Sequence, residues 1–240
     1  MQAGNGQKPE YILQPQCISR AMYNLSTNAR RLIGMAMALA DHEAYTVSFS
    51  PGAYKAALGL RWGGVNRELT RRAYLECTHS AVHIPLDGAG YQLIPWLDES
   101  AADLVYTNGH TIRMPLHPRL AELLIRDRHA TTTIRLSDLG KLQSRYAIRY
   151  FEWAMSYHNG TQWYFDAYIE NILALFCIEP HTYPSTRDFR LYIVDKPIAE
   201  LNARGIGIQI MPEKIRHGRE LAGWRFHCLK KGDTFFSGSS

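Results

Sequence analysis

The sequence has no hydrophobic run long enough to cross a bilayer, and its N-terminus lacks the apolar core of a secretory signal peptide. These absences predict a cytoplasmic protein without a membrane partner. There is also no Cys-x-x-Cys pair, because the four cysteines are scattered through the chain. We therefore expect reduced thiols, and neither a disulfide framework nor a zinc site.

Several signatures of enzymes that act on DNA are missing. No Gly-x-x-x-x-Gly-Lys-Ser/Thr phosphate loop is present, which argues against an ATP-driven helicase or initiator. No two histidines flank a single apolar residue, so a metal-dependent nicking enzyme would lack its ligands. His79 and His83 lie near Cys77, but at a helix-to-strand junction that implies no ligand geometry. No tyrosine is marked by a neighbouring base or cationic cluster. We therefore expect no enzymatic activity, no metal and no cofactor.

Lysine is scarce, and arginine supplies most of the positive charge. The chain has 20 Arg and 7 Lys against 22 acidic residues, a formal net charge of +5. Arginine is the side chain best suited to bidentate contacts with phosphate and guanine. The excess is concentrated between residues 183 and 231, which hold ten Lys/Arg and five Asp/Glu, whereas residues 1–130 hold 13 and 11. This distribution favours double-stranded DNA as a partner.

Hydrophobic periodicity and turn signals give two halves with one order of elements: long helix, short strand, helix, turn, helix, β-hairpin. That is the order of a winged helix. We predict an α+β protein with two tandem winged-helix domains. The expected division is a flexible arm at 1–17, a first domain at 18–130, a second domain at 131–232 and a flexible tail at 233–240.

In the first half, we expect helices at Ser26–Asp41, from Ser50 to Leu60, from Val65 to Cys77 and around Pro118–Ile125, a turn at Gly63-Gly64, and strands at Tyr45–Phe49, Ala81–Leu86, Tyr91–Leu97, Ala102–Tyr106 and Thr111–Pro115. The turn Asn108-Gly109 predicts that the last two strands form a hairpin.

In the second half, a strand at Thr131–Leu136 precedes a helix over Leu139–Trp153, which has a wide apolar stripe. Lys141, Arg145, Arg149 and Glu152 lie off that stripe and are expected to be solvated. Further on, we expect a strand at Gln162–Phe165, helices at 166–176 and 185–203, the latter broken or kinked at Pro197, and strands at Ile206–Met211 and Ala222–Leu229 joined by a basic turn.

Twelve residues are candidates for DNA contacts. The N-terminal turns of a recognition helix reach base edges, and the wing meets the phosphate backbone. On the last helix the candidates are Thr186, Arg187, Arg190 and Lys196; on the wing they are Lys214, Arg216, His217 and Arg219; a weaker set in the first half is Asn66, Arg67, Thr70 and Arg71. The first-half set is expected on the outer face of its helix, with Val65, Leu69 and Ala73 facing inward.

Three stretches resemble the iteron-binding plasmid replication initiators (Rep_3-type Rep proteins). Residues 142–152, Leu-Gln-Ser-Arg-Tyr-Ala-Ile-Arg-Tyr-Phe-Glu, are similar to that family's Leu-x-Ser-x-Tyr-Ala-x-Arg-Leu-Tyr-Glu signature, with Tyr-Phe in place of Leu-Tyr. Residues 183–202 are similar to its recognition helix, including the proline. Residues 215–219 and 223–226 look like its wing and return strand. The resemblance covers roughly residues 20–229 and is more specific in the second half.

This resemblance implies a bacterial protein that binds repeated sites at a plasmid origin, melts nearby DNA and recruits host replication proteins such as the initiator and the replicative helicase. It also implies a homodimer that represses its own gene, in equilibrium with monomers that load on the repeats. The alternative is a dimeric winged-helix transcriptional regulator with no role in initiation. An enzyme acting on DNA, a nickase or recombinase, is a more distant alternative.

The helix at Ser26–Asp41 is a candidate for self-association. Its centre, residues 32–40, is apolar around almost the whole circumference. A large exposed apolar patch is rare on a soluble monomer. We expect part of this surface, with Met37 on its outward side, to meet a second protomer; the alternative is a fully buried central helix.

Overall fold

The computed structural model describes residues 9–40, 45–60, 67–86, 90–99, 111–126, 130–158, 160 and 162–230. Asn66, the Gly63-Gly64 turn, the expected strand at Ala102–Tyr106 with its Asn108-Gly109 turn, and the tail at 233–240 lie outside these residues.

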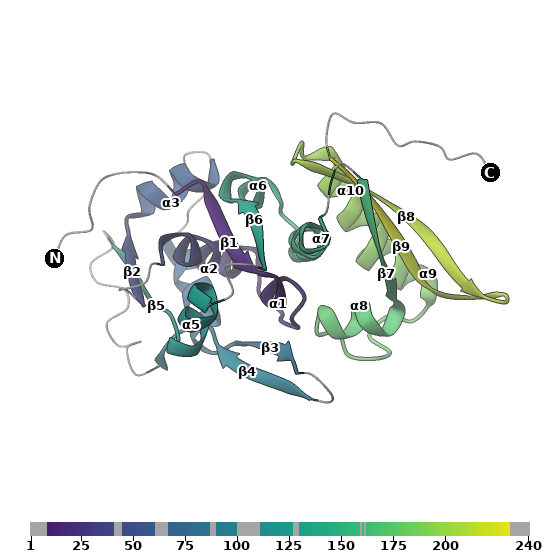
Figure 1. The fold of residues 1–240 in the computed structure, drawn as a ribbon, viewed down its shortest axis with the longest axis horizontal. Coiled ribbons are helices and arrows are strands. Elements are labelled where there is room, and N and C mark those ends of the chain that lie inside the picture. The colour runs from purple at the N-terminus through teal and green to yellow at the C-terminus, as the bar shows by residue number, and fades with distance from the viewer. Residues whose placement is uncertain are drawn as a thin grey trace.

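Within the described residues, the first half carries the expected helices and strands, with β1 and α1 in addition (Figure 1). In chain order they are β1 (Tyr11–Pro15), α1 (Gln16–Ser19), α2 (Thr27–Leu39), β2 (Thr46–Phe49), α3 (Pro51–Leu58), α4 (Arg67–Thr78), β3 (Ala81–Pro85), β4 (Tyr91–Pro95), β5 (Ile112–Pro115) and α5 (Pro118–Arg126). The run from α2 through the β3–β4 hairpin has the order of a winged helix.

The second half repeats that order. It comprises β6 (Thr131–Arg135), α6 (Leu136–Lys141), α7 (Arg145–Ser156), β7 (Gln162–Tyr168), α8 (Ile169–Leu175), α9 (Thr186–Phe189), η2 (Arg190–Asp195), α10 (Lys196–Ala203), β8 (Ile208–His217) and β9 (Glu220–Lys230). β7, β9 and β8 form an antiparallel sheet in that spatial order. Helix α7 stands between this sheet and the first half (Figure 1). The α+β expectation is confirmed.

Serine caps explain where three helices begin. Ser26 accepts a hydrogen bond from the Ala29 N–H at the start of α2. Ser50, followed by a proline in the first turn, accepts one from the Ala53 N–H, 3.0 Å away, at the start of α3. Ser144 does the same for the first turn of α7. Each cap pairs an N–H that the helix itself leaves without a partner.

The expected flexible arm at 1–17 contains a strand. β1 pairs with β6 in antiparallel register, with Leu13 opposite Thr133. Within β1, Ile12 is buried while Tyr11 and Leu13 are exposed. The Gly, Gln and Pro content of this stretch suggested a loose chain, but the alternation over residues 11–13 is the period of a strand.

The expected helix over Leu139–Trp153 is two helices, separated at residues 142–144. Arg31 of α2 donates to the carbonyls of Gly140 and Leu142, at 3.0 and 2.6 Å, so the end of α6 is held by the first half. Glu200 of α10 accepts from the backbone N–H groups of Gln143 and Ser144. The break is therefore fixed from both sides by side chains that are distant in sequence.

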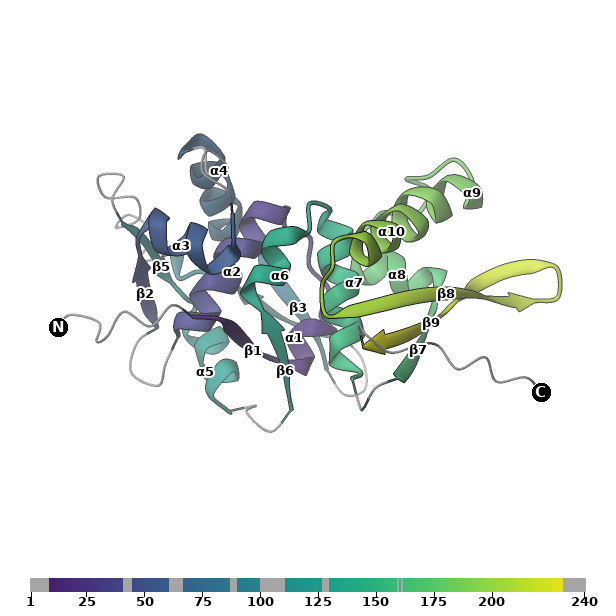
Figure 2. The same cartoon turned by 90° about the horizontal axis from the view of Figure 1, so that it is seen from above.

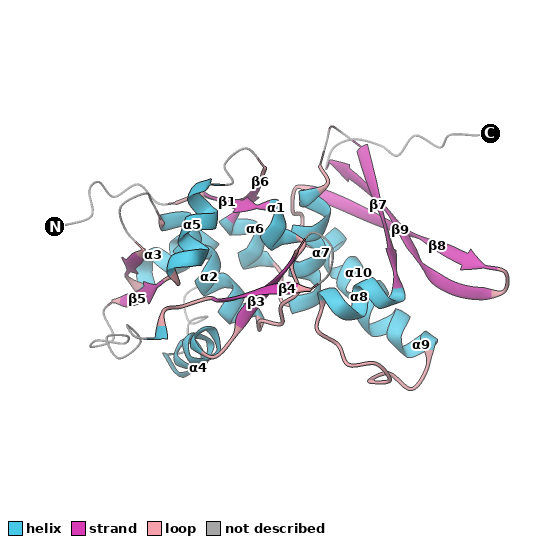
Figure 3. Ribbon diagram, turned by 60° about the horizontal axis from the view of Figure 1, so that its bottom comes forward, coloured by secondary structure: helices cyan, strands magenta, loops and turns pink. Residues whose placement is uncertain are grey.

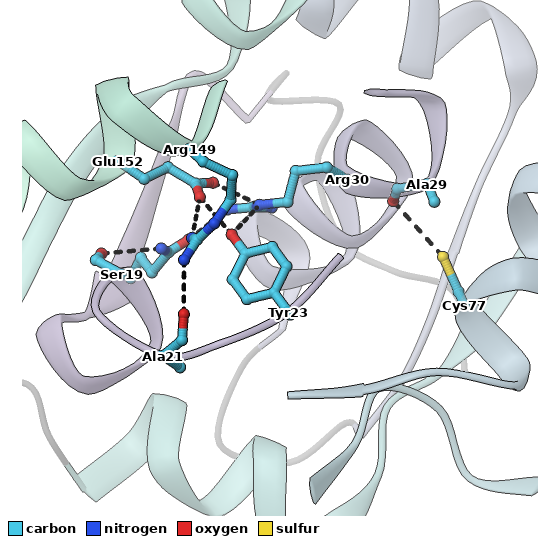
Figure 4. A network of polar contacts seen from close by, with 9 residues as sticks. Ser19, Ala21, Tyr23, Ala29, Arg30, Cys77, Arg149 and Glu152 are labelled. Carbon is cyan, nitrogen blue, oxygen red and sulfur yellow. Dashed lines mark hydrogen bonds and ion pairs between the residues drawn. The ribbon is translucent and has the colours of Figure 1, made fainter. Parts of the chain in front are cut away.

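Two residues of α7 that were expected to be solvated are buried. Arg149 is 4% exposed and Glu152 is fully buried. The Glu152 carboxylate accepts from Arg30 of α2, from the Tyr23 hydroxyl and from Arg149, whose Nη1 lies 2.8 Å from Oε2 (Figure 4). The apolar stripe could not reveal this, because each charge is compensated by a partner from a different element.

Helix α2 is the central core helix of the first half. All residues from Ala29 to Met37 are buried, and Met37 is 5% exposed. The expectation that Met37 faces outward toward a second protomer is wrong. The all-round apolar pattern instead reflects packing by α4, α6, β1 and α7 on several sides of one helix.

Candidate nucleic-acid interface

Helix α9 begins at a well-formed cap. Ser185 accepts from the Asp188 N–H at 3.1 Å and donates to its carboxylate at 2.7 Å. The inward face of α9, η2 and α10 consists of five buried residues: Phe189, Ile193, Val194, Ile198 and Leu201. That anchoring leaves Thr186 and Arg187 exposed on the first turn.

Pro197 does not break this helix. A proline has no N–H to donate and its ring clashes with the carbonyl of the fourth residue before it. The chain accommodates it by widening the preceding turn into the π-helical η2, so that the Lys196 N–H bonds to the Leu191 carbonyl. Of the two predicted outcomes at Pro197, a break or a kink, the break is wrong, because α9, η2 and α10 follow one another without interruption.

The wing is longer than expected. The segment predicted as a basic turn continues the strands, and β8 and β9 meet at a turn over Gly218 and Arg219, where Gly218 has a φ of 62°. Lys214, Arg216 and His217 lie on β8 itself, exposed, and a register shift falls between Ile215 and Arg216. Such a bulge bends and twists the strand.

Two side chains of α10 set the position of the wing and of α7. The Asn202 amide donates to the Ile210 carbonyl and accepts from the Ile210 N–H, each at 2.8 Å, which ties α10 to β8. Glu200 accepts from the backbone ahead of α7, as described above. Both residues lie in the stretch 183–202 that resembles the recognition helix of the plasmid initiators, but their contacts were not predicted from it.

The candidate residues of the second half lie on the continuous helix formed by α9, η2 and α10 and on the β8–β9 hairpin. Thr186 and Arg187 lie on α9, and the Arg190 Nε is 2.9 Å from Asp195. The Lys196 ammonium lies 4.2 Å from the centroid of the Tyr192 ring. The β8–β9 hairpin extends beyond the rest of the fold beside this helix (Figure 2). The residues predicted to read bases and those predicted to bind phosphates therefore lie on neighbouring elements.

Helix α4 of the first half projects on the same side of the molecule as α9 and α10 (Figures 2 and 3). Its exposed face differs from the predicted one. Thr70 and Tyr74 are buried, and Leu69, expected inward, is 46% exposed. The buried stripe runs through Thr70, Ala73, Tyr74 and Cys77, which pack toward α2. The proposed role of Thr70 in DNA contact is therefore wrong.

Arginines remain on the exposed face of α4. Arg71 donates to Glu68 at 2.9 Å, and Arg72, which the sequence analysis missed, does so at 2.8 Å. These hydrogen bonds lower the pKa of Glu68 to about 2. Thr70, Ala73 and Tyr74 are spaced three and four residues apart and therefore share one face of the helix. If that face is buried, Arg72 lies on the exposed side. The backbone of Arg67 begins α4, and its side chain lies outside the described atoms.

No group of three or more potential metal ligands occurs among the described residues. Cys77 is fully buried, and its thiol donates to the Ala29 carbonyl. None of the described helices combines the length and the apolar character needed to span a membrane.

Comparisons with known proteins agree with this arrangement. In fold, the chain is similar to the crystal structure of the Pi initiator protein in complex with iteron DNA, with a TM-score of 0.70 and 14% identity, over 95% of this chain and 100% of that one. A crystal structure of domains 2 and 3 of RctB matches with a TM-score of 0.50 and 10% identity, over 86% of this chain and 81% of that one. No curated protein matches the chain.

Two family models match the sequence. The one described as Initiator Replication protein, WH1, matches residues 12–155, and the one described as Initiator Rep protein, WH2, matches residues 168–228. Together they cover most of the chain, so this protein belongs to the family of initiator replication proteins, built from two winged-helix domains.

Proposed function

We propose that this initiator recognises repeated duplex sites at a plasmid origin in the bacterial cytoplasm. The second winged helix supplies the main contacts, with α9 in the major groove and the β8–β9 wing on the backbone. The observation that carries the proposal is the exposure of Thr186 and Arg187 on the first turn of α9, beside the basic wing. The N-terminal turns of a recognition helix are the part that contacts base edges.

Each element has a different task in this proposal. Arg187 and Arg190 read bases, since arginine can bond to both O6 and N7 of guanine. Lys214, Arg216, His217 and Arg219 hold the phosphates, and contacts of that kind position the protein without reading sequence.

Helix α4 supplies the accessory contact. Arg71 and Arg72 are exposed on α4, and this helix projects on the side of the molecule that also carries α9 (Figure 2). In this proposal the first half makes accessory DNA contacts and self-associates, and the second half makes the principal DNA contacts.

The similarity in fold to Pi initiator protein in complex with iteron DNA supports direct repeats as the target. Footprinting on the DNA that flanks the protein's own gene tests this. We expect protection of direct repeats spaced by about two helical turns, beside an A·T-rich segment whose strands separate easily. Protection of a single inverted repeat, with no repeats elsewhere, would instead indicate a transcriptional regulator.

We also propose that the protein self-associates through its first half and recruits host replication proteins once bound. With α2 buried, the exposed apolar side chains of the β3–β4 hairpin region become the candidate surface: Leu86, Tyr91 and Leu93 are each more than half exposed. Sedimentation of Leu93→Glu should show a folded protein with weaker self-association, and an unchanged dimer would place the interface elsewhere.

Recruitment of host replication proteins is tested separately. Capture of the host initiator and the replicative helicase on origin DNA is measured with and without this protein.

A further inference from the structure

The ion pair between Arg190 and Asp195 depends on the π-helical turn. Arg190 Nε lies 2.9 Å from Oδ2 and 3.3 Å from Oδ1 of Asp195. Their positions differ by five residues, and in an α-helix side chains face each other at spacings of three and four. A π-helical turn, whose hydrogen bonds join residues five apart, brings them together.

The pair uses only one edge of the guanidinium. Asp195 contacts Nε, and no described residue forms a hydrogen bond or ion pair with Nη1 or Nη2 of Arg190. The Arg190 side chain is 42% exposed. Two parallel N–H donors at the end of the guanidinium can pair with O6 and N7 of guanine, provided that the planar group is held in one orientation.

The surroundings also favour a fixed orientation. Phe189 and Ile193, on either side of Arg190 in sequence, are buried and anchor this stretch of helix. Tyr192 stacks near Tyr183, with ring centroids 6.5 Å apart, and lies under the Lys196 ammonium. Arg190 therefore projects from a turn whose backbone is held by packing on both sides.

We propose that Asp195 is a positioning residue for sequence recognition, which holds the Arg190 guanidinium for bidentate contact with one guanine. This rests on the proposed function of α9 as the base-reading helix. Asp195 does not itself touch the base. It adds negative charge near the DNA backbone, so its presence weakens general attraction to DNA while sharpening the choice of one base pair.

Selection from a library of random duplexes tests this. The sequence chosen by the wild-type protein is determined first, and Arg190→Ala identifies the base pair whose preference depends on Arg190. Asp195→Asn should reduce the preference at that same base pair about tenfold, within the range for a lost bidentate contact. Its affinity for unrelated duplex should be unchanged or higher. Adding Asp195→Asn to Arg190→Ala should cause no further loss of preference, because the two residues act as a unit.

Asp188→Asn is the matched control, because it removes the same charge from the preceding turn, where Asp188 bonds to Ser185 rather than to an arginine. It should leave the preference at the Arg190-dependent base pair intact. If Asp195→Asn behaves like Asp188→Asn, or loses affinity for all duplexes in parallel, the inference is wrong while the proposed function stands. If the wild-type protein selects no sequence at all, the proposed function fails and the inference fails with it.

Discussion

Arg30 of α2 and Glu152 of α7 form a fully buried ion pair, with Nε and Oε1 2.5 Å apart. Glu152 also accepts from Tyr23 and Arg149 (Figure 4). Arg149 in turn donates to the Ala21 carbonyl at 2.6 Å and lies over the Tyr23 ring. These contacts join α7 to α2 and to the segment that leads into α2.

Glu152→Gln should destabilise the fold by about 3–5 kcal/mol, because it leaves two buried guanidinium groups without their counter-charge. Urea unfolding followed by circular dichroism measures this. Asp166→Asn, which removes the exposed partner of Arg225, is the control and should barely move the midpoint. Equal effects of the two substitutions would mean that burial of the network is unimportant.

Alkaline pH should weaken the fold through Tyr23. Burial, acting together with the negative charge of Glu152, raises the pKa of Tyr23 to about 12. Because the folded-state pKa lies above the unfolded value near 10, the stabilisation is complete below pH 10 and is lost as the pH rises toward 12. The loss from this one group is up to about 3 kcal/mol.

Tyr23→Phe should therefore show a shallower decline in unfolding free energy between pH 10 and 12 than the wild-type protein, even if it is less stable at neutral pH. Other buried tyrosines titrate in both proteins and cancel in the comparison. Identical slopes would show that Tyr23 ionises as easily in the folded protein as in the unfolded chain.

Gly140→Ala should destabilise the contact between α6 and α3. A Cβ at this position would lie 1.8 Å from the carbonyl oxygen of Leu58, so the backbone must move. We expect a cost of at least about 1–3 kcal/mol, seen as a lower thermal midpoint. Gly207→Ala, where an added Cβ meets no atom within 4 Å, should leave the midpoint close to that of the wild type.

The sequence predicted the elements that depend on local signals. Hydrophobic periodicity, turn signals and the order of helices and strands located most of the fold, including the helix that carries Thr186 and Arg187. It could not predict which side of α4 is buried, because apolar Leu69 is exposed while Thr70 packs inward. A helix that is apolar on all sides, such as α2, can be a buried core helix or part of a protomer interface, and only the tertiary packing decides between the two.

The same limit applies to charged residues. Arg149 and Glu152 look like surface charges until partners from distant segments are brought to them. The widened turn before Pro197 was also out of reach, since a proline within a helix can produce a break, a kink or a π-helical turn. The sequence placed the basic residues 214–219 together on the wing. It did not predict that β8 extends through His217, because that extension depends on pairing with β9.

The helix and the wing should respond differently to loss of an arginine. Arg187→Ala should reduce discrimination between the selected site and unrelated duplex by about 1–3 kcal/mol, as expected for a base-reading contact. Arg216→Ala or Arg219→Ala should weaken binding to both duplexes alike. Competition gel shifts with the two duplexes separate these outcomes. If Arg187→Ala weakens binding to both duplexes equally, bases are recognised by another element.

The most direct test of the central claim is the salt dependence of binding to duplex DNA. Each phosphate contact releases counterions, so log affinity should fall linearly with log salt at a slope of about −0.9 per contact. With the cations on α4, α9 and the wing we expect roughly four to eight contacts per protomer, and a slope between about −3.6 and −7.2. A titration that gives such a slope supports DNA binding through this surface, and a nearly flat titration contradicts it.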